Sequence, residues 1–140
     1  NIADIMNLVM YSTRSMYVSE KYLLIGYVGN FIVCTAIVER VDPIKVFKIG
    51  NISAMLNIEY NFLITSVVVH PVYRHKRFCQ RMCKIVFDFV DDRYDNYQLH
   101  LEVDRNNSYA IRCYEKRNFK LDDNIDVLDD PTRFAVMTYK

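Results

Sequence analysis

The stretch from Asn61 to Val90 constrains the fold of this chain more than any other part of its sequence. It opens with an apolar, β-branched run, and Pro71 ends that run because proline has no N–H to donate to a β-ladder. After a cationic turn over residues 74–77, apolar side chains recur every three or four positions, which is the period of one helix face. The sequence therefore predicts a strand, a short basic turn and a helix. The first free N–H groups of that helix would lie beside the positive charges, which suits a phosphate or pyrophosphate group.

Length and composition favour one globular domain over residues 1–140. The chain has 140 residues, of which 51% are hydrophobic and 25% charged, and this is enough to build a core. The formal net charge of +1 argues against a nucleic-acid partner. No apolar run reaches the roughly 18 residues of a membrane span, so no membrane partner is expected, and the N-terminal segment lacks the pattern of a signal peptide. We therefore expect an intracellular, cytoplasmic protein.

The spacing of Cys79 and Cys83, four residues apart on the predicted helix, is compatible with a metal ion. The other two cysteines, Cys34 and Cys113, do not complete a recognisable second pair of ligands. We therefore predict no metal site and interpret the four cysteines as small, reduced core residues of an intracellular protein.

The other segments predict a mixed α/β chain. An amphipathic helix is expected over 2–18, and a short strand and a turn of helix within 44–57. The remaining predicted elements are an antiparallel hairpin of strands 22–27 and 31–40, a central strand 58–69, a helix 75–92, a strand 98–103, a helix 107–117, and strands 119–123 and 133–139 around an acidic loop. This order favours a mixed sheet with helices on both faces.

Two stretches carry matches to one known family. The first, VVVHPVYRHKRFCQRM, fits an apolar strand with the pattern V-x-P-x-Y-R and then a turn that opens a helix. The second, LHLEVDRNNSYAIRCYEKRNF, fits L-x-L-E-V followed by N-x-x-A-x-x-x-Y-E-K-x-G-F, and its matching residues are Leu99, Leu101, Glu102, Val103, Asn107, Ala110, Tyr114, Glu115, Lys116 and Phe119. In these motifs the chain resembles the GNAT superfamily of acetyl-CoA-dependent N-acetyltransferases.

The resemblance implies a fold, a reaction and partners. The fold would be a central mixed β-sheet of about six to seven strands with helices on both faces. The reaction would transfer an acetyl group from acetyl-CoA, the cosubstrate, to an amine, which could be a protein N-terminus, a lysine or a small amine. Exposed final strands in this fold often pair between subunits, so the resemblance also allows a homodimer.

The resemblance also assigns roles to residues of this chain. Tyr114 would be the general acid that protonates the departing CoA sulfur, and Glu102 would be the base that accepts a proton from the amine, often through water. The backbone around Val67, Val68 and Val69 would bind the pantetheine arm and polarise the thioester carbonyl. The remaining cofactor-binding residues would be Arg74, His75, Lys76, Arg77, Phe78 and Cys79 in the turn, and Asn107 at the start of the second helix.

Three positions depart from the family pattern. Arg77 and Cys79 replace the two glycines of the turn, and Asn118 replaces the glycine before the final phenylalanine. Arg77 must then adopt a backbone conformation that a Cβ resists, at a cost of about 1 kcal/mol or more, or turn differently. The alternative interpretation is therefore a catalytically inactive domain of this fold that serves as a protein-binding or structural module.

Other residues could act as the base. Glu59 lies four residues before Leu63, on the same face of the predicted central strand, and His70 and His100 could accept a proton near neutral pH. A lone histidine, however, is more often structural. In other branches of the family the base lies on the central strand at the position of Leu63, whose side chain cannot accept a proton.

Overall fold

The computed structural model describes residues 7–14, 20–74 and 77–139. The chain divides into two compact units, and each is described by itself. Unit 1 comprises residues 1–39 and 64–93, and unit 2 comprises residues 40–63 and 94–140. No helix in the described ranges is long and apolar enough to cross a membrane.

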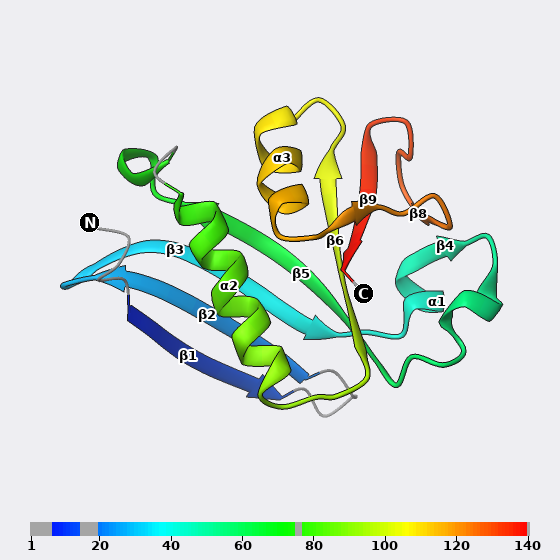
Figure 1. Ribbon diagram of the computed structural model, residues 1–140, viewed down its shortest axis with the longest axis horizontal. Coiled ribbons are helices and arrows are strands. Elements are labelled where there is room, and N and C mark those ends of the chain that lie inside the picture. Colours follow the sequence, from blue (N-terminus) through cyan, green and yellow to red (C-terminus); the bar gives the residue numbers. More distant parts are fainter. Residues whose placement is uncertain (1–6, 15–19, 75–76, 140) are drawn as a thin grey trace. The chain divides into compact units, whose positions relative to one another are not determined.

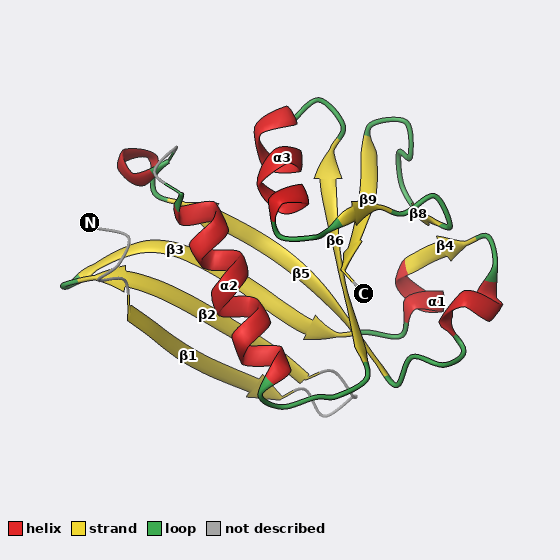
Figure 2. Cartoon of the chain, in the orientation of Figure 1, coloured by secondary structure: helices red, strands yellow, loops and turns green. Residues whose placement is uncertain are grey.

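The strands form one large and one small sheet (Figures 1 and 2). In hydrogen-bonded order the large sheet consists of β1 (Asn7–Arg14), β2 (Glu20–Val28), β3 (Phe31–Arg40), β5 (Tyr60–Val69), β6 (Tyr97–Asp104), β9 (Phe134–Tyr139) and β7 (Lys120–Leu121). The small sheet pairs β4 (Phe47–Ile49) with β8 (Ile125–Val127). The α-helices are α1 (Pro43–Val46), α2 (Phe78–Asp91) and α3 (Ser108–Lys116), and two short 3-10 helices are η2 (Ile52–Met55) and η3 (Pro71–Tyr73). The predicted mixed α/β class with a sheet of six to seven strands is confirmed.

Unit 1 has an antiparallel sheet that carries α2. The predicted β2–β3 hairpin is confirmed, because these strands pair antiparallel around a turn at residues 29–30. Helix α2 packs on this sheet through Phe89, whose ring centroid lies 4.8 Å from that of Tyr22 on β2. The face of α2 that includes Met82, Val86 and Phe89 is buried, as its sequence period predicts.

The predicted N-terminal helix is wrong over residues 7–14, where the chain forms β1. This strand pairs antiparallel with β2 over its full length, from Asn7 opposite Tyr27 to Arg14 opposite Glu20. The segment contains Val9 and Tyr11, which favour strands, although its apolar residues also fit a helical period. Pairing with β2 therefore decided a local pattern that was compatible with both structures. The rest of the predicted helix lies outside the described residues.

The segment before β5 also differs from its prediction. Residues 43–46 form helix α1 instead of the start of a strand, because Pro43 stands at its first position and the carboxylate of Asp42 caps it. The Asp42 Oδ1 atom accepts a hydrogen bond from the Ile44 N–H at 3.2 Å. The strand begins only at Phe47, and the predicted turn of helix is confirmed as η2.

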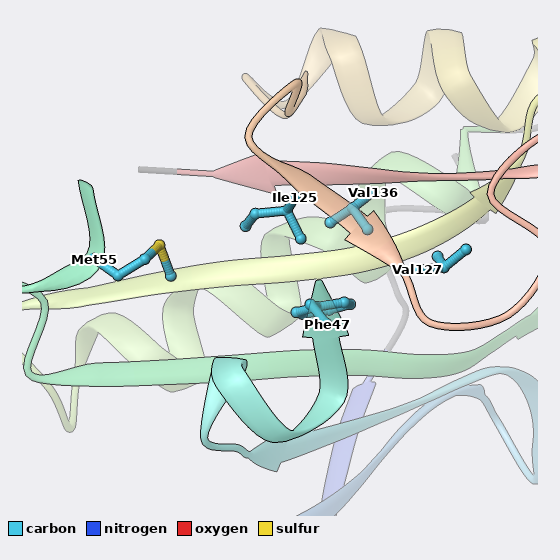
Figure 3. Close-up of a cluster of buried hydrophobic side chains, with 5 residues drawn as sticks. All are labelled: Phe47, Met55, Ile125, Val127 and Val136. Carbon is cyan, nitrogen blue, oxygen red and sulfur yellow. The ribbon is translucent and has the colours of Figure 1, made fainter. Parts of the chain in front are cut away.

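Unit 2 has a layer on each face of the β6–β9 pair. On one face, Leu99 and Leu101 of β6 lie opposite Tyr139 and Met137 of β9, and the Phe119 ring that follows α3 contacts Tyr139 with centroids 5.9 Å apart. On the other face lies a buried cluster of residues from η2, the small sheet and β9, shown in Figure 3: Phe47, Met55, Ile125, Val127 and Val136. Strand β8 lies in the segment that the sequence predicted as an acidic loop.

A pair of asparagines closes the open end of the small sheet. The side-chain oxygen of Asn124 accepts a hydrogen bond from the Asn51 N–H, and its side-chain nitrogen donates to the Asn51 carbonyl at 3.0 Å. The Gly50 N–H donates to the Asn124 carbonyl at 2.7 Å. One side-chain amide thus continues the β4–β8 ladder by the equivalent of one residue.

Candidate active site

The predicted pantetheine-binding stretch lies at the end of β5 in unit 1, and it is not the fully buried strand that its sequence predicts. Val68 is 53% exposed, and Val67 and Val69 are half-buried. Two residues before Val68, Ser66 has a φ of 52°, which interrupts the extended backbone inside the strand. A polar residue in an apolar run is the only trace of this break in the sequence.

The Arg74 side chain folds back onto the end of this strand. Its Nε atom donates a hydrogen bond to the Val69 carbonyl at 3.0 Å. This bond uses one of the five N–H donors of a guanidinium group. The contact holds the guanidinium group of Arg74 next to the main chain that was predicted to bind the cofactor.

Arg77 adopts the left-handed conformation that the family's glycine would adopt. Its φ and ψ are 65° and 12°, and it is the N-cap residue of α2. The exposed Arg77 side chain makes no capping hydrogen bond to the helix. Of the two outcomes predicted for this residue, a backbone conformation that a Cβ resists is the one observed.

Of the other predicted turn residues, the structure describes the side chain of Cys79. Cys79 is buried, at 9% exposure, in the first turn of α2. Phe78 is the first residue of α2, and its side chain lies outside the described part of the structure, as do His75 and Lys76 entirely. The assignment of phosphate contacts to these residues stays a prediction.

In unit 2, Glu102 lies on the face of β6 opposite the leucines. Its neighbour across the ladder is Val136, which belongs to the buried cluster of Figure 3. The Glu102 side chain is exposed, yet partial burial raises the pKa of its carboxyl group above the ordinary value of 4.5. A carboxylate with a raised pKa is a stronger base than an ordinary one, which suits proton abstraction.

Tyr114 is buried on the α3 side of the same strands. It is 8% exposed, and its ring contacts that of Phe119 with centroids 5.8 Å apart. The helix ends here in a Schellman motif, in which the Phe119 N–H donates to the Tyr114 carbonyl and the Asn118 N–H donates to the Glu115 carbonyl. Asn118 has a φ of 67°, so this asparagine takes the left-handed position in place of the family's glycine. The residue that contacts the Tyr114 ring, Phe119, is therefore also hydrogen-bonded to the Tyr114 main chain at the end of the helix.

Asn107 is the N-cap of α3, as predicted. Its Oδ1 atom accepts a hydrogen bond from the Ala110 N–H at 3.1 Å. Its exposed amide group remains available for a further contact, which is the role that the resemblance assigns to it.

Of the three other residues considered as the base, the two histidines have hydrogen-bond partners and the glutamate is exposed. His70 caps η3, because its Nδ1 atom accepts a hydrogen bond from the Val72 N–H at 3.2 Å. His100 is fully buried, with its ring nitrogens 3.0 Å from the Thr138 hydroxyl and 2.9 Å from Asn61 Oδ1. Glu59 is exposed one residue before β5.

The site residues within unit 2 thus come from two faces. Tyr114 and Glu102 lie on opposite faces of β6, and Asn107 follows the end of that strand. Within unit 1, the end of β5 and the start of α2 are joined by the turn that contains Arg74 and Arg77. Each unit therefore carries the group of residues that its sequence motif predicts.

Comparison with known proteins identifies the family. The sequence matches the Acetyltransferase (GNAT) family over residues 15–119, so this chain belongs to that family. No curated protein matches it by sequence.

Solved structures share the fold at low sequence identity. One is Arabidopsis thaliana NAA60 in complex with a bisubstrate analogue, with a TM-score of 0.65 and 13% identity over 85% of this chain and 74% of that one. Arabidopsis thaliana Naa50 in complex with the bisubstrate analogue CoA-Ac-MVNAL has a TM-score of 0.61 and 18% identity over 84% and 72% of the two chains. Escherichia coli ElaA has a TM-score of 0.61 and 12% identity over 86% and 69%.

Proposed function

We propose that this protein transfers an acetyl group from acetyl-CoA to an amine. The observation that carries the proposal is the left-handed backbone of Arg77 at the N-terminus of α2. This left-handed backbone supports an anion site at the first N–H groups of α2, although the glycine is lost. Membership of the GNAT family and the structures of its members with CoA-containing ligands support acetyl-CoA as the cosubstrate.

The chemistry assigns one task to each group of residues. The main chain at Val67–Val69 would bind the pantetheine arm and polarise the thioester carbonyl, and exposure of Val68 supports access to it. Arg74, Arg77 and the first N–H groups of α2 would bind the diphosphate, with Asn107 as a further contact.

Proton transfer would use the two residues of unit 2. Glu102 would accept a proton from the amine, and its raised pKa supports that role. The amine nitrogen would then attack the thioester carbon, the C–S bond would break, and the Tyr114 phenol would give its proton to the departing sulfur. Because the two side chains lie on opposite faces of β6, acceptor and cofactor would approach from opposite faces.

The acceptor we favour is the N-terminal amine of a peptide. The Naa50 complex contains the bisubstrate analogue CoA-Ac-MVNAL, which supports this class. We further propose that both units act as one domain, because the family match runs through residues of each. A homodimer and an intracellular location stay predictions.

A catalytically inactive module is the second candidate. The observation in its favour is the hydrogen bond from Arg74 to the Val69 carbonyl, which engages main chain predicted to bind the cofactor. If this contact persists in the presence of acetyl-CoA, the pantetheine arm has one fewer partner on β5.

Calorimetric titration with acetyl-CoA separates the two candidates. The enzyme should bind at micromolar concentration, and Arg74→Glu should abolish binding, whereas Lys45→Glu, an equal charge reversal at an exposed position of α1, should not change it. Absence of heat at millimolar acetyl-CoA would leave the inactive module.

Activity on a peptide library then tests the acid. Tyr114→Phe should lower kcat while acetyl-CoA binding remains, because the ring packs against Phe119 without need of the hydroxyl. An unchanged kcat would remove Tyr114 from the mechanism.

A further inference from the structure

Four large apolar side chains at one end of unit 1 are exposed. They are Phe31 and Ile32, at 72% and 57% exposure, and Val68 and Val72, at 53% and 64%. The first two begin β3 at the hairpin turn, and the others flank the end of β5. A 2.7 Å hydrogen bond from the His70 N–H to the Val33 carbonyl joins these two segments. Exposed apolar groups that gather in this way usually mark a binding surface.

Within the hairpin and the β5–α2 segment, the charges at this end are positive. Residues 22–38 and 64–87 contain no aspartate or glutamate, whereas Arg74 and Arg77 are exposed and the sequence between them adds His75 and Lys76. The acidic residues of the described part of unit 1 lie toward its other end, at the start of β2, the end of β3 and the end of α2: Glu20, Glu39, Asp88, Asp91 and Asp92.

The order of charges along α2 is also informative. Basic residues occupy its N-terminal half and acidic residues its C-terminal end, which is the reverse of what the helix dipole favours. This arrangement of charges lowers the stability of the helix. A negatively charged partner at the basic end would account for the arrangement better than helix stability does. Unit 1 therefore has a charge asymmetry that would orient it in the field of a negatively charged partner.

We propose that this end of unit 1, defined by Phe31, Ile32, Val72, Arg74 and Arg77, docks on the surface of an anionic lipid membrane. The β2–β3 hairpin and η3 project at this end, opposite the C-terminus of α2 (Figure 1). Protruding apolar tips beside cations suit a fluid bilayer, where Phe31 and Ile32 enter the headgroup region and the arginines meet lipid phosphates. An acidic peptide would instead need a groove to receive its side chains.

This proposal concerns a peripheral contact. It agrees with the absence, among the described residues, of a helix that could span a membrane. It does not depend on acetyl transfer, because Phe31 and Ile32 belong to none of the groups assigned to the cofactor or the reaction. The arginines serve both proposals, so they are not used in the test.

Intrinsic fluorescence gives the first test, because the chain has no tryptophan. Phe31→Trp introduces a single reporter at the hairpin, and Leu56→Trp is the matched control at a 73% exposed position of unit 2. With phosphatidylcholine vesicles containing about a quarter phosphatidylserine, emission of the first variant should shift to the blue, and that of the control should not. Equal shifts, or none, would overturn the proposal. A shift on raising protein concentration without vesicles would overturn it in favour of a second copy of the chain.

Vesicle sedimentation gives the second test. Phe31→Ser combined with Ile32→Ser should weaken partitioning by roughly tenfold, whereas Leu56→Ser with Leu128→Ser, at 73% and 65% exposure, should have no effect. Binding should also fall as salt rises and be absent on pure phosphatidylcholine. Binding that survives the hairpin substitutions would refute apolar insertion. Unchanged acetyl-CoA titration and thermal unfolding in this variant would show that the loss is specific to the membrane contact.

Discussion

Replacing Arg77 with glycine should stabilise the protein. A non-glycine residue in the left-handed region costs about 1–2 kcal/mol, and Arg77 lies there with a φ of 65°. Glycine removes this cost but gains conformational entropy in the unfolded chain, which offsets about 0.5–1 kcal/mol. The net gain for Arg77→Gly should therefore be about 0.5–1 kcal/mol, or roughly 2–4 °C in Tm for a chain of this size.

Arg77→Ala is the matched variant. It removes the same charge and the same side-chain atoms beyond Cβ, but it keeps the Cβ that creates the strain. The free energy of unfolding, measured by urea titration, should therefore be about 1 kcal/mol higher for the glycine variant than for the alanine variant. Both lack the guanidinium group, so the comparison cancels any electrostatic contribution of Arg77.

Asn118 provides an internal reference. It has nearly the same φ, 67°, but asparagine tolerates this region better than arginine does. Asn118→Gly should therefore stabilise the protein by less than Arg77→Gly. Equal unfolding free energies for the glycine and alanine variants at position 77 would refute the argument that the backbone is strained there.

Two further predictions concern unit 2. Because the pKa of Glu102 is raised, the folded state binds the proton of this carboxyl group more tightly than the unfolded chain does. The protonated carboxyl group therefore contributes fully to stability below the unfolded pKa, and this contribution is lost as pH rises through the folded pKa. Urea titrations should show Glu102→Gln gaining stability relative to wild type as pH rises from below the unfolded pKa through the folded pKa of Glu102, and a pH-independent difference would contradict this. His100→Leu should lower the unfolding free energy by roughly 2–5 kcal/mol, because it leaves buried Asn61 and Thr138 without their partner. The double variant with Asn61→Leu should then cost less than the sum of the two single changes, and strict additivity would argue against the network.

The sequence predicted best where one local rule decided the structure. The β2–β3 hairpin, the start of α3 at Asn107 and the left-handed Asn118 each follow from turn or capping chemistry that lies within a few residues. The family motifs likewise placed Glu102 and Tyr114 on the predicted strand and helix. These features need no information about distant parts of the chain.

The sequence failed where a distant partner decided the structure. Strand β1 has a helical apolar spacing, and only the open edge of β2 makes it a strand. Strand β8 is three residues long, and it exists because β4, about eighty residues earlier, pairs with it. The break at Ser66 was missed for a different reason: a serine at φ 52° has no sequence signature.

The hydrogen bonds between Asn51 and Asn124 at the end of the small sheet affect residues beyond that sheet. Phe47 and Val127 pack in one buried cluster with Val136, and Val136 is the ladder neighbour of Glu102. Without the hydrogen bonds between Asn124 and Asn51 this end of the small sheet would open, and the partial burial that raises the pKa of the exposed Glu102 would decrease. An amide at the rim of the molecule would in this way tune the acidity of a carboxyl group on another strand.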